Sequence, residues 1–133
     1  MSSAVYLETS VLLHLLFREP GYERWFEEVK KADRILTSRL TWIESHRALI
    51  RLSLDVGEGT MALADLQRSL SAYFSRMDLF EMTPEICELA SRIAPRSRLR
   101  TLDAIHLATF HELRKRRSDL SFLSRDDRLV AAL

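Results

Sequence analysis

Four acidic residues stand where a buried strand ends or where a helix turns toward a cleft: Glu8, Glu44, Asp103 and Asp126. In open α/β sheets, ligands bind outside the carboxyl ends of the parallel strands, so acids at such places converge on one crevice. Carboxylates that share a crevice repel each other and stay ionised only with a cation among them. Because oxygen ligands select a hard ion, the pattern predicts a site for Mg²⁺ or Mn²⁺.

Each of these acids also has a simpler explanation, since acids make up 19 of the 133 residues. Glu8 can be a charge at a helix N-terminus, where the helix dipole favours anions. Ser124 and Asp127 resemble a capping arrangement, so Asp126 beside them can belong to a helix cap. Asp103 can be an acid of a first helical turn, but it shares its azimuth with apolar residues one and two turns on. We therefore expect Asp103 to face inward.

Glu44 lies in a helix that is apolar on nearly every other side. It shares a narrow stripe of that helix with Arg47 and Arg51. One interpretation is a solvated stripe with a Glu-Arg pair at i, i+3, worth a few tenths of a kcal/mol. The other is a polar stripe that lines a cleft, and the sequence leaves both open.

Basic residues crowd the segment that leads to Asp103, although the net charge is only +1. Arginine has a planar fork of donors that suits phosphate oxygens. We predict that Arg98 and Arg100 contact the phosphates of a substrate. A second basic run, 114–117, ends the following helix, where the helix dipole also favours cations. His106, one turn after Asp103, is interpreted as a satisfied core or boundary histidine, with a hydrogen bond near the site as the alternative.

The chain is long enough for one domain, residues 1–133, around a single core. Its longest apolar run, 11–17, is interrupted by His14 and is far shorter than the roughly 20 residues of a membrane span. The first residues lack the basic region of a signal peptide. Cys87 has no second cysteine to pair with, which favours a reducing cytoplasm.

Short apolar runs alternate with helical segments along the chain. Apolar runs predict strands at 4–7, 34–37, 79–82 and 120–123. Turn, capping and periodicity signals predict helices that start near Thr9 and Tyr22, helices at 40–54, 60–76, 84–95 and 102–115, and a short helix in the tail. The alternation predicts an α/β fold with three layers, in which helices cover both faces of a short parallel sheet.

Four blocks of sequence, at 5–10, 40–44, 102–108 and 123–129, resemble a PIN domain of the VapC toxin type. The resemblance extends over essentially the whole chain. It implies a Mg²⁺- or Mn²⁺-dependent endoribonuclease that a cognate antitoxin holds in check and that forms a homodimer. It implies the four acids as catalytic, metal-binding residues, with hydroxyl support from Thr9, Ser10 and Ser124. Surface near Trp25, Phe26 and Val29 is expected to belong to the antitoxin groove, although such a helix face is more often core.

One residue departs from the family, which usually has aspartate where this chain has Glu8. One more methylene moves the carboxylate by roughly 1.5 Å, whereas productive sites tolerate about 0.5 Å. A binding module that keeps the fold but has weakened or lost turnover is therefore the alternative function. A phosphohydrolase is a further alternative, but it would need a nucleophilic aspartate at the first strand. We expect metal-dependent hydrolysis of RNA phosphodiester bonds.

Overall fold

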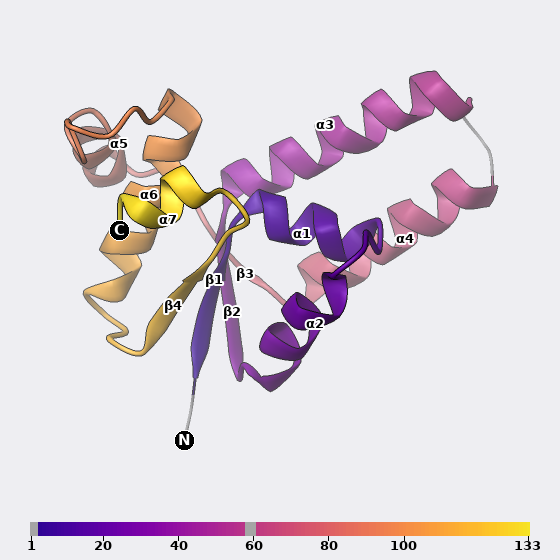
Figure 1. Cartoon of the computed structure of the whole chain (residues 1–133), viewed down its shortest axis with the longest axis horizontal. Coiled ribbons are helices and arrows are strands. Elements are labelled where there is room, and N and C mark those ends of the chain that lie inside the picture. The colour runs from indigo at the N-terminus through magenta and orange to yellow at the C-terminus, as the bar shows by residue number, and fades with distance from the viewer. Residues whose placement is uncertain (1–2, 58–60) are drawn as a thin grey trace.

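Four parallel strands form the sheet at the centre of the molecule (Figure 1). The computed structural model describes residues 3–57 and 61–133. The strands lie in the order β3-β2-β1-β4. Their bounds are β1 Ala4–Leu7, β2 Arg34–Ser38, β3 Asp78–Phe80 and β4 Leu120–Leu123. The parallel sheet expected from the sequence is thereby confirmed.

Helices cover both faces of the sheet, as the continuous apolar strands predicted. Alternate residues of β1 enter different cores, because successive side chains of a strand point to opposite faces. Val5 and Leu7 pack with residues of α1, α2, α3 and α4, whereas Ala4 and Tyr6 pack with residues of α6. The fold therefore has the three expected layers. The helices are α1 Thr9–Leu16, α2 Tyr22–Lys31, α3 Arg39–Val56, α4 Met61–Ser75, α5 Pro84–Ala90, α6 Thr101–Arg114 and α7 Asp127–Ala131.

Local signals in the sequence explain where several of these helices begin or end. Gly21 has φ 90° and is the N-cap of α2, in a left-handed conformation that favours glycine. Gly57, with φ 85°, follows the last residue of α3. Thr83 caps α5 through the N–H of Ile86, and Pro84 takes the first helical position. The expected break at Gly59 and helix start at Thr60 lie outside the described residues.

Two expected boundaries are wrong. Strand β3 ends at Phe80 instead of Met82, because its partner Ser38 is the last residue of β2 and no further backbone is there to pair with. Helix α5 ends at Ala90 instead of near Pro95. A residue before proline is disfavoured in helical conformation, and Ala94 has φ 48°, so the chain has already left the helix before the proline.

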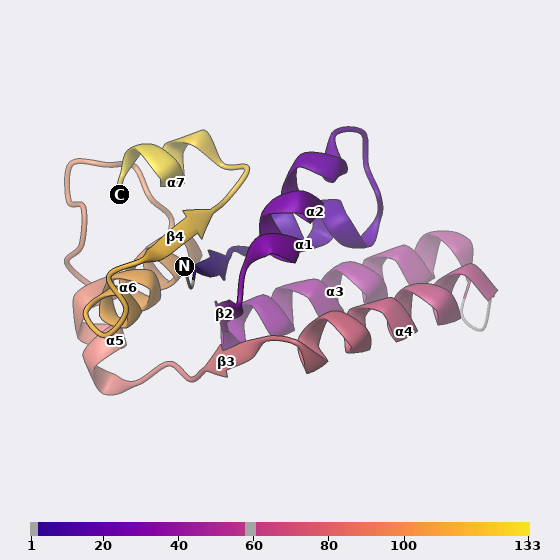
Figure 2. The same ribbon diagram turned by 90° about the horizontal axis from the view of Figure 1, so that it is seen from below.

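Helices α3 and α4 run side by side and project from the sheet as an arm (Figures 1 and 2). The buried side chains of Leu49 and Leu70 join this arm to the main core. The α2 face singled out in the sequence is mixed: Val29 is buried in the core and Trp25 packs against it, whereas Phe26 is 43% exposed. Within the described ranges, no helix is both long and apolar enough to cross a membrane.

Candidate active site

A hollow of about 440 Å³ lies beside the carboxyl ends of β1 and β4. It brings together three of the four predicted acids, which come from α3, α6 and the N-terminus of α7. The residues that line it are Glu44, Arg100, Thr101, Leu102, Asp103, Asp126 and Arg128. Glu8 is not among them. The parallel sheet therefore gathers side chains that are far apart in sequence at one edge, as the fold class requires.

Glu44 is held in place by hydrogen bonds on its interior side. Its Oε1 accepts from the Thr9 hydroxyl at 2.6 Å and from Nε2 of His106 at 2.8 Å. Its side chain is 28% exposed, whereas Arg47 and Arg51 on the same helix are exposed. The three residues therefore do not share one environment, and only Glu44 reaches the hollow.

The pKa of Glu44 reflects two opposing effects. Burial raises the pKa of this carboxyl, but the hydrogen bonds from His106 and Thr9 lower the pKa by more than burial raises it. The pKa of Glu44 therefore lies below its ordinary value. Hydrogen bonds to an ionised carboxylate favour the charged form. Glu44 is therefore kept as an anion at the edge of the hollow.

Glu8 is buried, at 7% exposure, and caps α1 instead of lining the hollow. Its Oε2 accepts from the N–H of Ser10 at 3.0 Å. Its Oε1 accepts from the hydroxyls of Ser10 and Ser124, both at 2.6 Å. The helix-terminus interpretation of Glu8 describes this arrangement. Both oxygens of the longer side chain are committed to protein donors.

Ser10 and Ser124 also tie the ends of β1 and β4 together. The Ser10 hydroxyl accepts from the N–H of Arg125 at 2.9 Å, and the Ser124 hydroxyl accepts from the N–H of Asp126 at 3.0 Å. The N–H of Glu8 donates to the carbonyl of Leu123 at 3.0 Å. The two serines thus lie next to Glu8, and Thr9 lies next to Glu44.

Asp126 is both a cap and a wall of the hollow. Its Oδ1 accepts from the N–H groups of Arg128 and Leu129, which makes it the N-cap of α7. Burial raises the pKa of Asp126, but hydrogen bonds from Arg128 and the α7 backbone lower it overall. The capping interpretation is correct, although the cap is Asp126 itself. It does not remove the residue from the hollow.

Asp103 lies in the first turn of α6, where its Oδ2 accepts from the N–H of Arg100 at 3.3 Å. It is partly exposed and lines the hollow instead of pointing into the core. The expectation that it faces inward is therefore wrong. Helical azimuth alone missed this, because the apolar side of α6 begins one turn later, at the buried residues His106 and Leu107.

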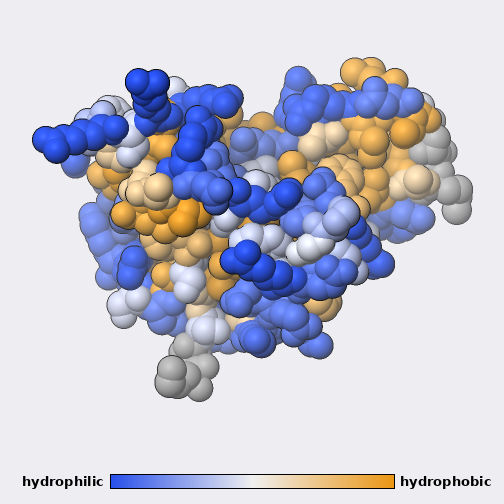
Figure 3. Space-filling model, in the orientation of Figure 1, coloured by the Kyte–Doolittle hydropathy of each residue, from blue (hydrophilic) through white to orange (hydrophobic). Residues whose placement is uncertain are grey.

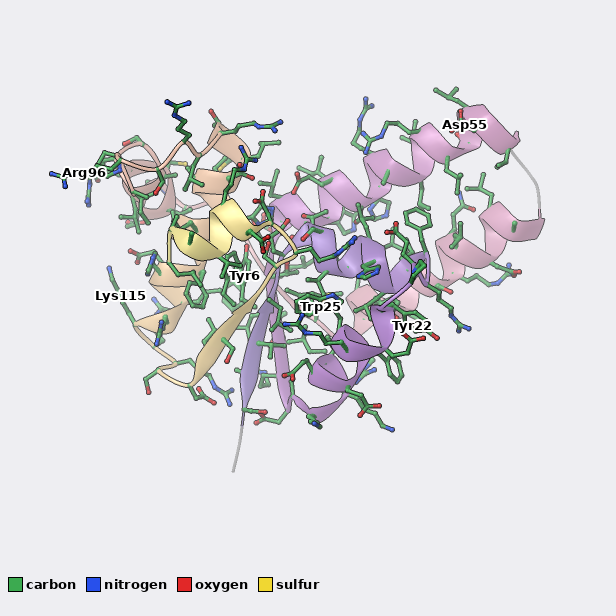
Figure 4. All side chains as sticks on the ribbon, in the orientation of Figure 1. Tyr6, Tyr22, Trp25, Asp55, Arg96 and Lys115 are labelled. Carbon is green, nitrogen blue, oxygen red and sulfur yellow. The ribbon has the colours of Figure 1, made fainter. Side chains whose placement is uncertain are left out.

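The loop between α5 and α6 brings only one of the two predicted arginines to the acids. Arg100 lines the hollow, whereas Arg98 is exposed and lies outside it. Arg96 of the same loop points outward from the molecule (Figure 4). Arg128 lines the hollow as well and was missed in the sequence, although its place two residues after Asp126 was the available signal. Two guanidinium groups and three carboxylates therefore share one surface.

His106 is buried and satisfied, as expected, but it also touches the site. Besides the bond to Glu44, its Nδ1 lies 2.9 Å from the hydroxyl of Tyr6. Tyr6 comes from β1 and is fully buried in the core (Figure 4). The sequence offered only the spacing to Asp103 as a signal for this contact.

The donor set fits a hydrated divalent cation. In the part of the chain that the structure describes, no three His, Cys, Asp or Glu side chains lie close enough together to form a metal cage. Mg²⁺ does not require one, because it keeps several waters and binds through one or two carboxylates and substrate phosphates. Glu44, Asp103 and Asp126 supply only carboxylate oxygens around one open hollow. The chemistry of these three carboxylates suits a hydrated ion, whereas Glu8 would have to give up its cap.

Comparisons with known proteins agree with this fold. The PIN domain family matches residues 5–132. Ribonuclease VapC46 of Mycobacterium tuberculosis (strain ATCC 25618 / H37Rv) is 33% identical over 111 residues, which cover 84% of this chain and 77% of that protein. Ribonuclease VapC35 of Mycobacterium tuberculosis (strain CDC 1551 / Oshkosh) is 35% identical over 108 residues, which cover 79% of this chain and 71% of that protein.

Two solved structures share the fold. A chain in a toxin-antitoxin complex from Klebsiella pneumoniae matches with a TM-score of 0.65 at 22% identity, covering 93% of this chain and 87% of that one. PAE2754 from Pyrobaculum aerophilum also matches with a TM-score of 0.65 at 22% identity, covering 98% of this chain and 79% of that one. With the family match over nearly the whole sequence and relatives above 30% identity, this chain belongs to the PIN domain family, among its VapC-type members.

Proposed function

We propose that this protein is a Mg²⁺- or Mn²⁺-dependent endoribonuclease and the toxin of a toxin-antitoxin pair, acting as one domain over residues 1–133. The observation that carries the proposal is the hollow in which three carboxylates and two arginines meet. Carboxylates suit the cation, and arginines suit the phosphates of the substrate. The names of the two mycobacterial relatives, both ribonucleases, support RNA as the substrate class.

The residues of the hollow divide the work by their chemistry. A bound cation lowers the pKa of a coordinated water and stabilises charge on the attacked phosphate. Glu44 and Asp103 would hold the ion most directly, and Asp126, whose Oδ1 is committed to the α7 cap, would reach it through water. Arg100 and Arg128 would bind and orient the phosphate backbone of the RNA. Arg98, outside the hollow, would contact a more distant phosphate.

Glu8 favours a second candidate function, a PIN-fold binding module with weakened turnover. Its carboxylate accepts three hydrogen bonds from Ser10 and Ser124 and does not line the hollow. A site with three acids in place of four would bind the ion more loosely. The two functions share the same fold and hollow, so a cleavage assay separates them.

Two protein partners complete the proposal. The solved chain from Klebsiella pneumoniae is part of a toxin-antitoxin complex, which supports a cognate antitoxin for this chain. The exposed ring of Phe26 lies at a small hollow between α2 and α4, lined also by Ala72 and Tyr73, which is a place for an apolar side chain of that antitoxin. A homodimer is the second partner that we propose, on the family resemblance.

The test is cleavage of a structured RNA by the purified protein. We expect cleavage with Mg²⁺ or Mn²⁺ and none with EDTA. Glu44→Gln and Asp103→Asn should each lower the rate at least about 100-fold, because losses around metal ligands are commonly 10–100-fold even outside direct coordination. Glu88→Gln, an exposed acid on α5, is the matched control and should cut like the wild type. If Glu44→Gln and Asp103→Asn both cut at the wild-type rate, the site is assigned wrongly.

A further inference from the structure

Tyr6 is held rigidly at the centre of the molecule. It is fully buried in the middle of β1, between Leu36 of β2 and Phe122 of β4. Its ring contacts Phe110 edge-on at 6.2 Å and Phe122 at 5.4 Å between centroids. A side chain packed in this way cannot swing its hydroxyl toward another partner without opening the core. The position of the Tyr6 hydroxyl is therefore fixed by the sheet and by α6.

His106 hydrogen-bonds to this fixed hydroxyl at one ring nitrogen and to Glu44 at the other. The Tyr6 hydroxyl lies 2.9 Å from Nδ1, and Nε2 lies 2.8 Å from Oε1 of Glu44. An ionised carboxylate can only accept, so Nε2 carries the proton and donates it. In the neutral ring Nδ1 must then accept, and the Tyr6 O–H donates to it. Each polar group of the chain Tyr6–His106–Glu44 has a partner of the correct kind.

Thr9 completes the fixation of the same oxygen. Its hydroxyl donates to Oε1 of Glu44 at 2.6 Å and lies 3.3 Å from Nε2 of His106. Oε1 is thus held by two donors from the interior of the protein. This leaves Oε2 as the Glu44 oxygen for a cation in the hollow.

We propose that His106 is a positioning residue: anchored by Tyr6, it fixes the Glu44 carboxylate so that one oxygen is presented to the divalent cation. The inference rests on the proposed function for the role of Glu44, but it adds a residue that the acid pattern does not contain. Ligating groups are commonly oriented by hydrogen-bonded neighbours of this kind, and their removal typically lowers metal affinity 10–100-fold. The chain also explains why a buried histidine lies one turn from Asp103.

The test exploits the two ends of the imidazole. Glutamine places its amide near the position of Nε2 and keeps a donor for Glu44, whereas asparagine reaches only the position of Nδ1 and keeps only the Tyr6 end. We expect His106→Asn to lower the affinity for Mn²⁺, measured by calorimetry without RNA, about 10–100-fold. His106→Gln should lose less than about tenfold, the lower bound of such effects. Thermal unfolding of each variant reports the general cost to the fold.

Tyr6→Phe keeps the ring in the core and removes only the hydroxyl. It should lower Mn²⁺ affinity by less than His106→Asn does, because Thr9 and the ring still hold Glu44 but the ring has lost its anchor. This variant also decides the matter if His106→Asn does not fold. Tyr73→Phe is the matched control and should bind Mn²⁺ like the wild type, because this tyrosine lies on α4 and does not line the hollow.

The outcomes separate this inference from the proposed function. If glutamine and asparagine at position 106 leave Mn²⁺ affinity unchanged, His106 is only a core residue and the inference is overturned. If both weaken binding equally, together with stability, the effect is general packing and the inference is again overturned. A wild type that binds Mn²⁺ but cleaves no RNA overturns the proposed nuclease and leaves the positioning role standing. A wild type that binds no Mn²⁺ overturns both.

Discussion

Two possible roles, helix capping and cation binding, compete for the carboxylate of Glu8. The N-terminus of α1 needs an acceptor for its unpaired N–H groups, and a cation site needs an oxygen that is free of other partners. In the structure Glu8 caps the helix, since Ser10 and Ser124 between them donate to both of its carboxylate oxygens. A glutamate is long enough to fold back in this way. Aspartate, the usual family residue, is itself one of the preferred helix caps but is shorter by one methylene.

Glu8→Asp is therefore expected to strengthen cation binding. The shorter side chain should keep the cap on the Ser10 N–H but should no longer reach both serine hydroxyls, which releases one oxygen toward the hollow. We expect Mn²⁺ affinity to rise by about tenfold, or about 1.4 kcal/mol, with a matching gain in RNA cleavage. Calorimetric titration at equal ionic strength measures this without a change in net charge.

Glu8→Gln is the control, because it keeps the length and removes the charge. It should bind Mn²⁺ no better than the wild type. An aspartate variant with wild-type affinity would mean that the local backbone already compensates for the extra methylene, and the departure from the family would carry no functional weight.

The sequence identified acids and hydroxyls, but it could not identify their partners. Acids at strand ends and helix turns could be singled out from the pattern around them, and three of the four predicted acids do share a hollow. The bond between Tyr6 and His106 joins residues 100 positions apart, and it depends on how α6 lies across the sheet. Local spacing holds no information on that packing. For the same reason the sequence offered Glu8 only, and only as an alternative, as a charge at a helix N-terminus, and not as the cap of α1.

The end of strand β3 depends on its pairing partner more than on the β propensity of its residues. The segment expected as a strand continues to Met82, but β3 ends at Phe80, because β2 gives way to α3 after Ser38. Turn and capping residues predicted helix boundaries better than apolar runs predicted strand ends. Gly21 and Thr83 precede helices and Gly57 follows one, where the sequence predicted breaks or caps. A strand needs a neighbour along its whole length, whereas a cap needs only its own helix. This difference explains which boundaries could be predicted.

Part of the apolar surface of helix α3 is not covered by other elements of the chain and is exposed. Ile43, Ile50 and Leu54 recur at helical spacing on one face and are 47%, 51% and 81% exposed. Figure 3 shows apolar surface gathered over the projecting arm of α3 and α4. Contiguous apolar surface that stays exposed in a monomer marks an interaction site. The proposed homodimer is the simplest occupant, because a two-fold interface uses the same patch twice.

Ile50→Glu together with Leu54→Glu should therefore break the homodimer. Each charge would enter the interface twice, so we expect the dissociation constant to rise at least about 100-fold, or about 2.7 kcal/mol. Light scattering coupled to gel filtration over a range of concentrations measures the change. Met82→Glu, an equally exposed apolar residue away from the arm, is the control and should leave the mass unchanged. A wild type that is monomeric at all concentrations would contradict the prediction.

The fold gathers three carboxylates and two arginines in one hollow. The chain is nearly neutral overall, at +1, but three carboxylates meet at one edge of its sheet. Like charges in one hollow destabilise the compact state unless a cation lies among them. Arg100 and Arg128 offset part of this repulsion, Arg128 through its contact with Asp126. Cation binding and folding should therefore be coupled in this protein.

A divalent cation should raise the thermal stability of the folded protein. A ligand that binds only the folded state adds about 2.7 kcal/mol at 100 times its dissociation constant. For a domain of this size that corresponds to a rise in the unfolding midpoint on the order of 10 °C. Scanning calorimetry with Mn²⁺ and with EDTA measures the difference.

The double variant Glu44→Gln, Asp103→Asn should respond far less, because two of the carboxylates that attract the ion are gone. NaCl at matched ionic strength separates binding from screening, since screening acts on every exposed charge and binding only on the hollow. An equal rise with NaCl, or an equal response of the double variant, would show that the hollow does not hold the ion.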